Sequence, residues 1–128
     1  MPGRVLLDTN IIIAFFAAEK AVIQHVTESV IFVSSTVLGE LHYGARKSAQ
    51  AVANQARIEE FAAAVAILSC DAEISRRYGQ IKDRLRLKGR PIPENDIWIA
   101  ASAFQHSLTL ATRDDHFRDV DGLRIETW

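Results

Sequence analysis

The sequence predicts an α/β protein, a three-layer α/β/α sandwich built on a mainly parallel sheet of about five strands. Short apolar runs alternate along the chain with longer stretches of helical periodicity, which is typical of βαβ units. The runs are continuously apolar, as strands covered on both faces require. The 128 residues contain no repeat, low-complexity tract or linker. We therefore expect a single domain over 1–128.

The five expected strands are short apolar runs that polar residues interrupt. The first ends at Asp8, and the second is followed by two serines. The third lies just before Asp71, and the last two lie near the end of the chain. We expect strands at 4–7, 30–33, 66–69, 109–112 and 123–126.

Six helices are expected between these strands, and several carry recognisable end signals. Either of the two serines after the second strand can cap the following helix, and Asp71 can cap a later one. Gly89 ends that helix, and the prolines at 91 and 93 keep the next segment extended. In the fourth helix, Val52, Ile58, Phe61 and Val65 are expected near one side. We expect helices at 10–17, 19–27, 36–46, 48–64, 72–88 and 95–106.

Composition excludes some classes of protein and leaves others open. The formal net charge of −1 provides no overall basic field for nucleic acid, so such binding would need a local patch. The single cysteine excludes an internal disulfide and a multi-cysteine zinc site. The longest apolar run, 11–18, is too short to cross a bilayer, and the first residues carry no secretory signal. We therefore expect a cytoplasmic protein with no membrane contact.

Four acidic residues are expected at one edge of the sheet. Asp8 follows the first strand, and Glu40 lies in the first turns of the helix after the second. Asp96 begins the helix that leads into the fourth strand, and Asp114 follows that strand. Ligand sites in open parallel sheets form beyond the carboxyl ends of the strands, where the strand order reverses. We therefore expect these acids to converge.

A group of carboxylates this close predicts a metal site. Mutual repulsion raises the pKa values of neighbouring carboxylates unless a cation compensates for their charge. Oxygen ligands suit Mg²⁺ or Mn²⁺, which keep several waters when they bind through a few carboxylates. Such an ion lowers the pKa of a bound water and stabilises the charge on a phosphodiester under attack.

Each acid also has a purely structural interpretation. Asp8 and Asp96 are suitable helix caps, and Glu40 alone resembles a partly solvated helix residue. Asp114 and Asp115 together are typical turn residues, and either could face the expected cleft. These interpretations explain the positions one by one but not their convergence, which favours a functional site.

The sequence resembles the PIN-domain family, and VapC-type toxins in particular, in four segments that occur in the family's order. The resemblance spans essentially the whole chain, and the four segments are specific in combination, although the first is weak alone. The segments are 7–10 (LDTN), 34–44 (SSTVLGELHYG), 95–101 (NDIWIAA) and 110–117 (LATRDDHF).

The resemblance implies a PIN-like fold and an endoribonuclease that hydrolyses RNA at an acidic metal site, usually leaving a 5′-phosphate and a 3′-hydroxyl. It implies that Asp8, Glu40, Asp96 and Asp114 are the catalytic, metal-binding residues, with Mg²⁺ or Mn²⁺ as cofactor. Asp8 and Asp96 are the foremost ligands, while Thr9 and Thr112 could orient a water or a neighbouring acid. It also implies a homodimer and a VapB-like antitoxin. The RNA itself, whether a tRNA, a ribosomal RNA or a messenger, stays open.

One basic tract and four histidines are further candidates. The tract's downstream end leads toward Asp96, so it could contact phosphates, but it could equally be a solvated helix face paired with acids or a partner contact. His116 could approach the cleft, whereas His25, His42 and His106 are expected elsewhere. The tract comprises Arg76, Arg77, Lys82, Arg84, Arg86, Lys88 and Arg90.

Two alternative functions are disfavoured. A phosphoacceptor receiver module has a similar fold but needs an aspartate at the end of the third strand, where the sequence reads Leu68-Ser-Cys70. It also needs a lysine after the fifth strand, where only Thr127 and Trp128 remain. The second alternative is a non-catalytic binding module on a PIN fold, but all four acids are present.

Overall fold

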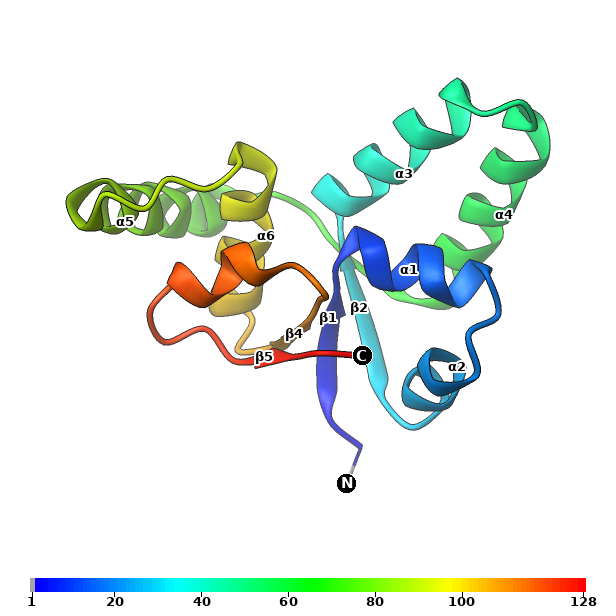
Figure 1. Cartoon of the computed structure of the whole chain (residues 1–128), viewed down its shortest axis with the longest axis horizontal. Helices are drawn as coiled ribbons and strands as arrows, with labels where there is room; N and C mark the ends of the chain where they lie inside the picture. The colour runs from blue at the N-terminus through cyan, green and yellow to red at the C-terminus, as the bar shows by residue number, and fades with distance from the viewer. Residues whose placement is uncertain (1) are drawn as a thin grey trace.

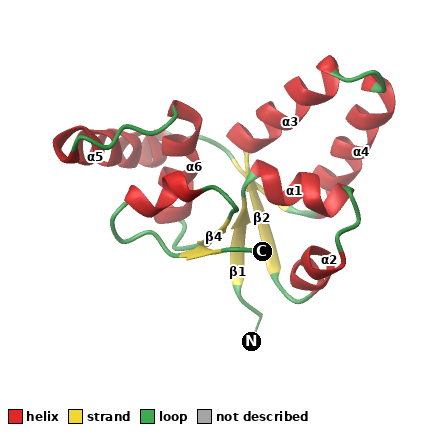
Figure 2. Ribbon diagram, in the orientation of Figure 1, coloured by secondary structure: helices red, strands yellow, loops and turns green. Residues whose placement is uncertain are grey.

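The computed structural model describes residues 2–128 and shows a five-stranded, entirely parallel sheet flanked by helices (Figure 1 and Figure 2). The strands are β1 (Arg4–Leu7), β2 (Val30–Ser34), β3 (Ala66–Leu68), β4 (Thr109–Ala111) and β5 (Ile125–Glu126). The α-helices are α1 (Thr9–Phe16), α2 (Lys20–Thr27), α3 (Ser35–Lys47), α4 (Ala51–Ala64), α5 (Ala72–Lys88) and α6 (Glu94–Gln105). A 3₁₀ helix, η1 (Asp115–Asp119), precedes β5. The predicted fold class is confirmed.

The strands lie in the order β3-β2-β1-β4-β5, so the direction in which successive strands are added to the sheet reverses once. The chain first runs outward from β1 through β2 to β3, and then returns past β1 to β4. Because crossovers between parallel strands are right-handed, this reversal places α1–α4 and α5–α6 on opposite faces of the sheet. In Figure 1, α1, α3 and α4 lie to the right of β1, and α5 and α6 lie to the left. The reversal between β1 and β4 is where a ligand site is expected.

The core lies around β1, β4 and α6. Leu6 and Leu7 of β1, Leu110 of β4 and Ile99 of α6 are completely buried. Burying each of these large aliphatic side chains stabilises the fold by about 1.5–3 kcal/mol. The two strands that carry the proposed acids are therefore also the most firmly packed part of the sheet.

Helix ends follow the predicted capping signals. Ser34 Oγ accepts a hydrogen bond from Val37 N, and Asp71 Oδ1 accepts one from Ile74 N. Gly89 ends α5 in the left-handed region with φ of 68°, a conformation that residues with a Cβ rarely adopt.

The structure corrects several details of the prediction. Helix α4 begins three residues later than expected, and Val52, predicted to share a side with Ile58 and Phe61, is 85% exposed while they are buried. Only its later apolar positions reach the core. The helix η1 was not predicted, because five residues rich in charge carry no helical periodicity.

Candidate active site

The register of the sheet brings Asp8 next to Thr112. Leu7 of β1 pairs with Ala111 of β4, so the residues that follow them leave the sheet side by side. Thr112 Oγ1 donates a hydrogen bond of 2.6 Å to Asp8 Oδ2, and both residues are buried. The site therefore begins at the strand reversal, at the carboxyl ends of β1 and β4.

Asp8 also caps α1. Its Oδ1 accepts a hydrogen bond from Thr9 N at 2.8 Å, and its Oδ2 accepts one from Asn10 Nδ2 at 3.3 Å. Asn10 Oδ1 in turn accepts a hydrogen bond from Arg113 N, which ties the first loop to the loop after β4. The capping interpretation of Asp8 is thus correct, and it does not exclude a role in the site.

Glu40 joins the group through Thr9. Thr9 Oγ1 donates a hydrogen bond of 3.0 Å to Glu40 Oε1, which links α1 to α3. Burial is the main cause that raises the pKa of Glu40, and the nearby charge of Asp8 raises it further. Thr9, predicted from the sequence as an orienting residue, therefore contacts one acid through its side chain and another through its backbone.

Asp96 and Asp114 complete the set. Asp96 lies within the first turn of α6 rather than at its cap, which is Pro93, so the capping interpretation of Asp96 is wrong. Asp114 receives a hydrogen bond from His116 N, and its own backbone N donates to Thr112 Oγ1 at 3.0 Å. The side chain of Asp115 is 90% exposed and pairs with Arg118. Asp114 rather than Asp115 therefore faces the other acids.

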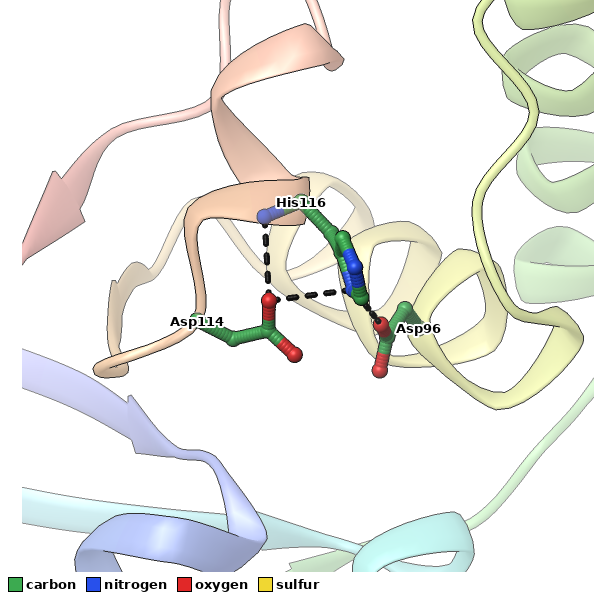
Figure 3. Close-up of side chains that lie close together, drawn as sticks. All are labelled: Asp96, Asp114 and His116. Atoms are coloured by element: carbon green, nitrogen blue, oxygen red, sulfur yellow. Dashed lines mark hydrogen bonds and ion pairs between the residues drawn. The ribbon is translucent and has the colours of Figure 1, made fainter.

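The imidazole of His116 lies between two of these carboxylates (Figure 3). Its Nδ1 is 3.2 Å from Asp96 Oδ2 and 3.0 Å from Asp114 Oδ1. The sequence left the position of His116 open, and the structure places it inside the site. The three side chains offer ligand atoms that all lie within 4.8 Å of one another.

Three of these carboxyl groups, those of Asp8, Glu40 and Asp96, have raised pKa values. Burial, with additional repulsion from Asp8 and Asp114, raises the pKa of Asp96 to about 6, against the lowering effect of His116. Burial likewise raises the pKa of Asp8, although Thr112 and the Thr9 amide stabilise its charged form. The hydrogen bond to Asp96 is the main cause of the raised pKa of His116. Removing these carboxylates from water therefore disfavours their charged forms.

No lysine or arginine compensates for this charge within residues 2–128. The only cationic side chain hydrogen-bonded or ion-paired to Asp8, Glu40, Asp96 or Asp114 there is His116. A cluster of four carboxylates with one imidazole fits a divalent cation, which prefers oxygen ligands and offsets their repulsion.

Two pockets lie near this region. One of about 410 Å³ borders Thr9 and Glu40 and is lined mainly by apolar residues of α1, α3 and α4, including Ile13, which is 56% exposed. The other, of about 610 Å³, lies between α5 and α6 and contains none of the four acids. Only the first pocket is continuous with the candidate site.

The basic tract on α5 is largely paired. Lys82 contacts Glu94 at 2.5 Å, Arg86 contacts Asp83 at 2.7 Å, and Lys88 contacts Asp121 at 3.0 Å. Arg84 lies 4.0 Å from Asp121. All these pairs are substantially exposed, so each contributes little to stability and can exchange its partner for another anion.

The chain belongs to the PIN domain family, which matches residues 5–123. It is 35% identical over 129 aligned positions to the tRNA(fMet)-specific endonuclease VapC of Shigella flexneri, with 98% of each chain covered. It is also 35% identical to ribonuclease VapC2 of Haemophilus influenzae, with the same coverage. The resemblance noted from the sequence is therefore confirmed.

Solved structures with a similar fold are also members of VapBC complexes. The DNA-bound VapBC complex of Salmonella typhimurium contains a chain with a TM-score of 0.92 and 31% identity, covering 100% of this chain and 99% of that one. VapBC2 of Rickettsia felis, bound to a DNA fragment from its promoter, gives a TM-score of 0.90 at 30% identity, with 98% of each chain covered. The receiver alternative is wrong because the chain belongs to the PIN domain family, and Asp71 caps α5, as the sequence indicated.

Asn10 and the position of His116 were the main features that sequence reasoning missed. Asn10 lies in the LDTN segment, so its proximity to Asp8 was visible, but its bond to Arg113 depends on the pairing of β1 with β4. His116 follows two aspartates, and only the turn of η1 directs its ring back toward Asp96.

Proposed function

We propose that this protein is a divalent-metal-dependent endoribonuclease and the toxin of a type II toxin–antitoxin pair. The observation that carries the proposal is the group of four carboxylates at the strand reversal, which form no hydrogen bond or ion pair with a lysine or arginine side chain of residues 2–128. The names of the relatives, ribonuclease VapC2 and tRNA(fMet)-specific endonuclease VapC, support RNA as the substrate. The match of the PIN family to residues 5–123 supports treating the chain as a single domain.

Asp8, Asp96, Asp114 and Glu40 would hold Mg²⁺ or Mn²⁺. When bound, the ion activates a water and neutralises charge on the phosphodiester. Thr112 Oγ1 joins the side chain of Asp8 to the backbone N of Asp114, and Thr9 Oγ1 holds Glu40 against the start of α1. Asn10 fixes the distance between the loops that carry Asp8 and Asp114. These neutral donors hold the carboxylates in place without cancelling their charge.

Removing the metal is expected to abolish RNA cleavage. Without a cation the four carboxylates repel an incoming phosphodiester, and no metal-bound water is available as the nucleophile. We expect cleavage with Mg²⁺ or Mn²⁺, no cleavage in EDTA, and recovery when the ion is added in excess. The Asp8→Asn protein, purified in parallel, reveals any contaminating nuclease. Full activity of the wild type in EDTA, above that background, would refute the metal mechanism.

The basic tract on α5 is proposed to contact RNA phosphates. Its exposed ion pairs can be replaced by phosphate contacts, which release counterions. Reversing two charges (Arg84→Glu with Arg86→Glu) should weaken binding to RNAs of different sequence alike and reduce the slope of log K against log salt by roughly 1 to 2.

Binding is measured in the Asp8→Asn background, so that the RNA stays intact. A matched control carries Arg4→Glu with Lys20→Glu, which makes the same change in net charge; Arg4 lies at the start of β1, at the opposite end of the strand from Asp8. Equal effects of the two double variants would show that only overall charge matters, and the tract would lose its assigned role.

A VapB-like antitoxin and a second copy of the chain are the proposed protein partners. The similar solved structures are VapBC complexes, which supports the antitoxin. The apolar pocket beside Glu40 offers an antitoxin segment a surface that reaches the acids without depending on any one carboxylate. We therefore expect antitoxin binding to survive the loss of Asp8.

A further inference from the structure

The backbone of His116 is held in place on both sides, although its side chain is partly exposed. Asp114 caps η1 by accepting a hydrogen bond from the backbone N of His116, and Phe117 beside His116 is completely buried. The ring therefore projects from an anchored turn toward α6, and Nδ1 faces Asp96 and Asp114 together (Figure 3). The side chain is 53% exposed, so water can still reach this region.

The distances around Nδ1 fit the coordination shell of a metal. Neighbouring ligands of an octahedral ion with bonds of about 2.1 Å lie about 3 Å apart, which is the bond length multiplied by √2. Nδ1 is 3.0 Å from Asp114 Oδ1 and 3.2 Å from Asp96 Oδ2. Nδ1 thus has the separation of an adjacent ligand from each of the two carboxylate oxygens, and all three ligand atoms lie within 4.8 Å of one another.

Hydrogen bonding alone accounts for this arrangement less well. Nδ1 carries at most one proton and can donate it to one acceptor, yet it faces two carboxylate oxygens at similar distances. A cation shared by the imidazole and both carboxylates would satisfy all three groups.

We propose that His116 is a direct ligand of the metal ion, through Nδ1, and that it biases the centre toward Mn²⁺ and away from Mg²⁺. The inference rests on the metal-dependent function proposed above and changes its expected ligand set from oxygen alone to mixed oxygen and nitrogen. Imidazole is a poor ligand for Mg²⁺ and a good one for transition ions, whereas carboxylates accept both. A single imidazole among carboxylates therefore selects between two ions that oxygen ligands distinguish poorly.

The direct test is pulsed electron paramagnetic resonance of Mn²⁺ bound to the full-length protein, with no RNA present. Protein with ¹⁵N-labelled histidine is compared with unlabelled protein, because a directly bonded imidazole nitrogen couples strongly to the Mn²⁺ electron spin. We expect histidine coupling in the wild type, its loss in His116→Asn, and its retention in His42→Asn. His42 is the matched control, since it lies two residues from Glu40 but pairs with Glu59.

The affinity of the protein for Mn²⁺ and for Mg²⁺ is a second test. Asn at position 116 can place an amide oxygen near the position of Nδ1, so His116→Asn should keep Mg²⁺ binding while its Mn²⁺ affinity falls by about tenfold or more. Calorimetric titration with each ion measures the ratio, and circular dichroism confirms the fold.

The possible results separate this inference from the function on which it rests. Mn²⁺ that binds without histidine coupling, or coupling lost in His42→Asn instead, would overturn the role of His116 and leave the metal mechanism intact. Absence of any Mn²⁺ or Mg²⁺ binding to the wild type would overturn both.

Discussion

Replacing Asp8 by asparagine is expected to slow RNA cleavage by at least about a hundredfold, equivalent to about 2.7 kcal/mol of transition-state stabilisation. Asp8 is 5% exposed, lies at the end of β1, and is fixed by Thr112, Asn10 and the Thr9 amide. An asparagine side chain has nearly the same shape but lacks the negative charge that would hold the cation. The loss should appear in the chemical step, which single-turnover cleavage measures.

The fold should survive this substitution. Burial disfavours the charged form of Asp8, so removing its charge relieves an unfavourable term in the metal-free protein. Asparagine is also as good a helix cap as aspartate, and α1 therefore keeps its start. Asp115→Asn is the matched control, because the same chemical change occurs one residue from Asp114 on a side chain that is 90% exposed. We expect Asp115→Asn to cleave RNA like the wild type.

The same variants connect the site to toxicity. Expressed without an antitoxin, the wild type and Asp115→Asn should arrest growth, and Asp8→Asn should not. If folded Asp8→Asn and Asp96→Asn proteins both arrest growth like the wild type, toxicity does not depend on this site and the proposed mechanism is wrong.

Much of the fold could be predicted because the chain marks its elements locally. Continuous apolar runs such as 5–7 favour buried strands. Residues such as Ser34, Asp71 and Gly89 mark helix ends by their own hydrogen bonds or backbone preference. The convergence of the acids followed from topology, since the carboxyl ends of parallel strands meet at one edge. Neither inference needed a side-chain distance.

The details that sequence reasoning missed depend on tertiary geometry. Asp114 and Asp115 are chemically identical neighbours, and only the turn into η1 decides which one faces Asp8. The same turn directs His116 toward Asp96. Val52 has the hydrophobicity of a core residue, but α4 begins at the end of the α3–α4 hairpin that lies away from the sheet (Figure 1), and Val52 is exposed there. Local composition contains none of this information.

The metal-free protein is expected to lose stability as the pH rises from about 4 to about 6, and Asp96 is the main cause. Its pKa is about 6 in the folded protein against 3.8 in the unfolded chain, so the folded state retains this proton longer. The stabilisation is complete below about pH 4 and disappears as the pH rises through about 6. The difference corresponds to about 3 kcal/mol at 1.36 kcal/mol per pKa unit.

Other groups in the site act in the same direction but do not obscure the contribution of Asp96. The pKa of His116 is raised from 6.5, so its stabilisation is lost at higher pH than that of Asp96. Asp8 and Glu40 also have raised pKa values, but they remain in an Asp96→Asn variant. Comparing wild type with Asp96→Asn across the pH range therefore measures Asp96 together with the part of the His116 shift that Asp96 causes, and that part is lost at higher pH.

Asp96→Asn should raise the melting temperature of the metal-free protein at pH 7.5 by roughly 5 °C or more and flatten its dependence on pH between 4 and 6. Excess Mg²⁺ should reverse the order. Mg²⁺ at a thousand times its dissociation constant stabilises the wild type by about 4.1 kcal/mol, which exceeds the cost of the Asp96 charge, and the variant, which lacks one ligand, should gain much less. Thermal unfolding with EDTA and with Mg²⁺ measures both effects, and Asp115→Asn should behave like the wild type throughout. A variant less stable than the wild type in EDTA at pH 7.5 would show that the charge of Asp96 does not destabilise the metal-free protein. A variant stabilised equally by Mg²⁺ would show that Asp96 does not hold the ion.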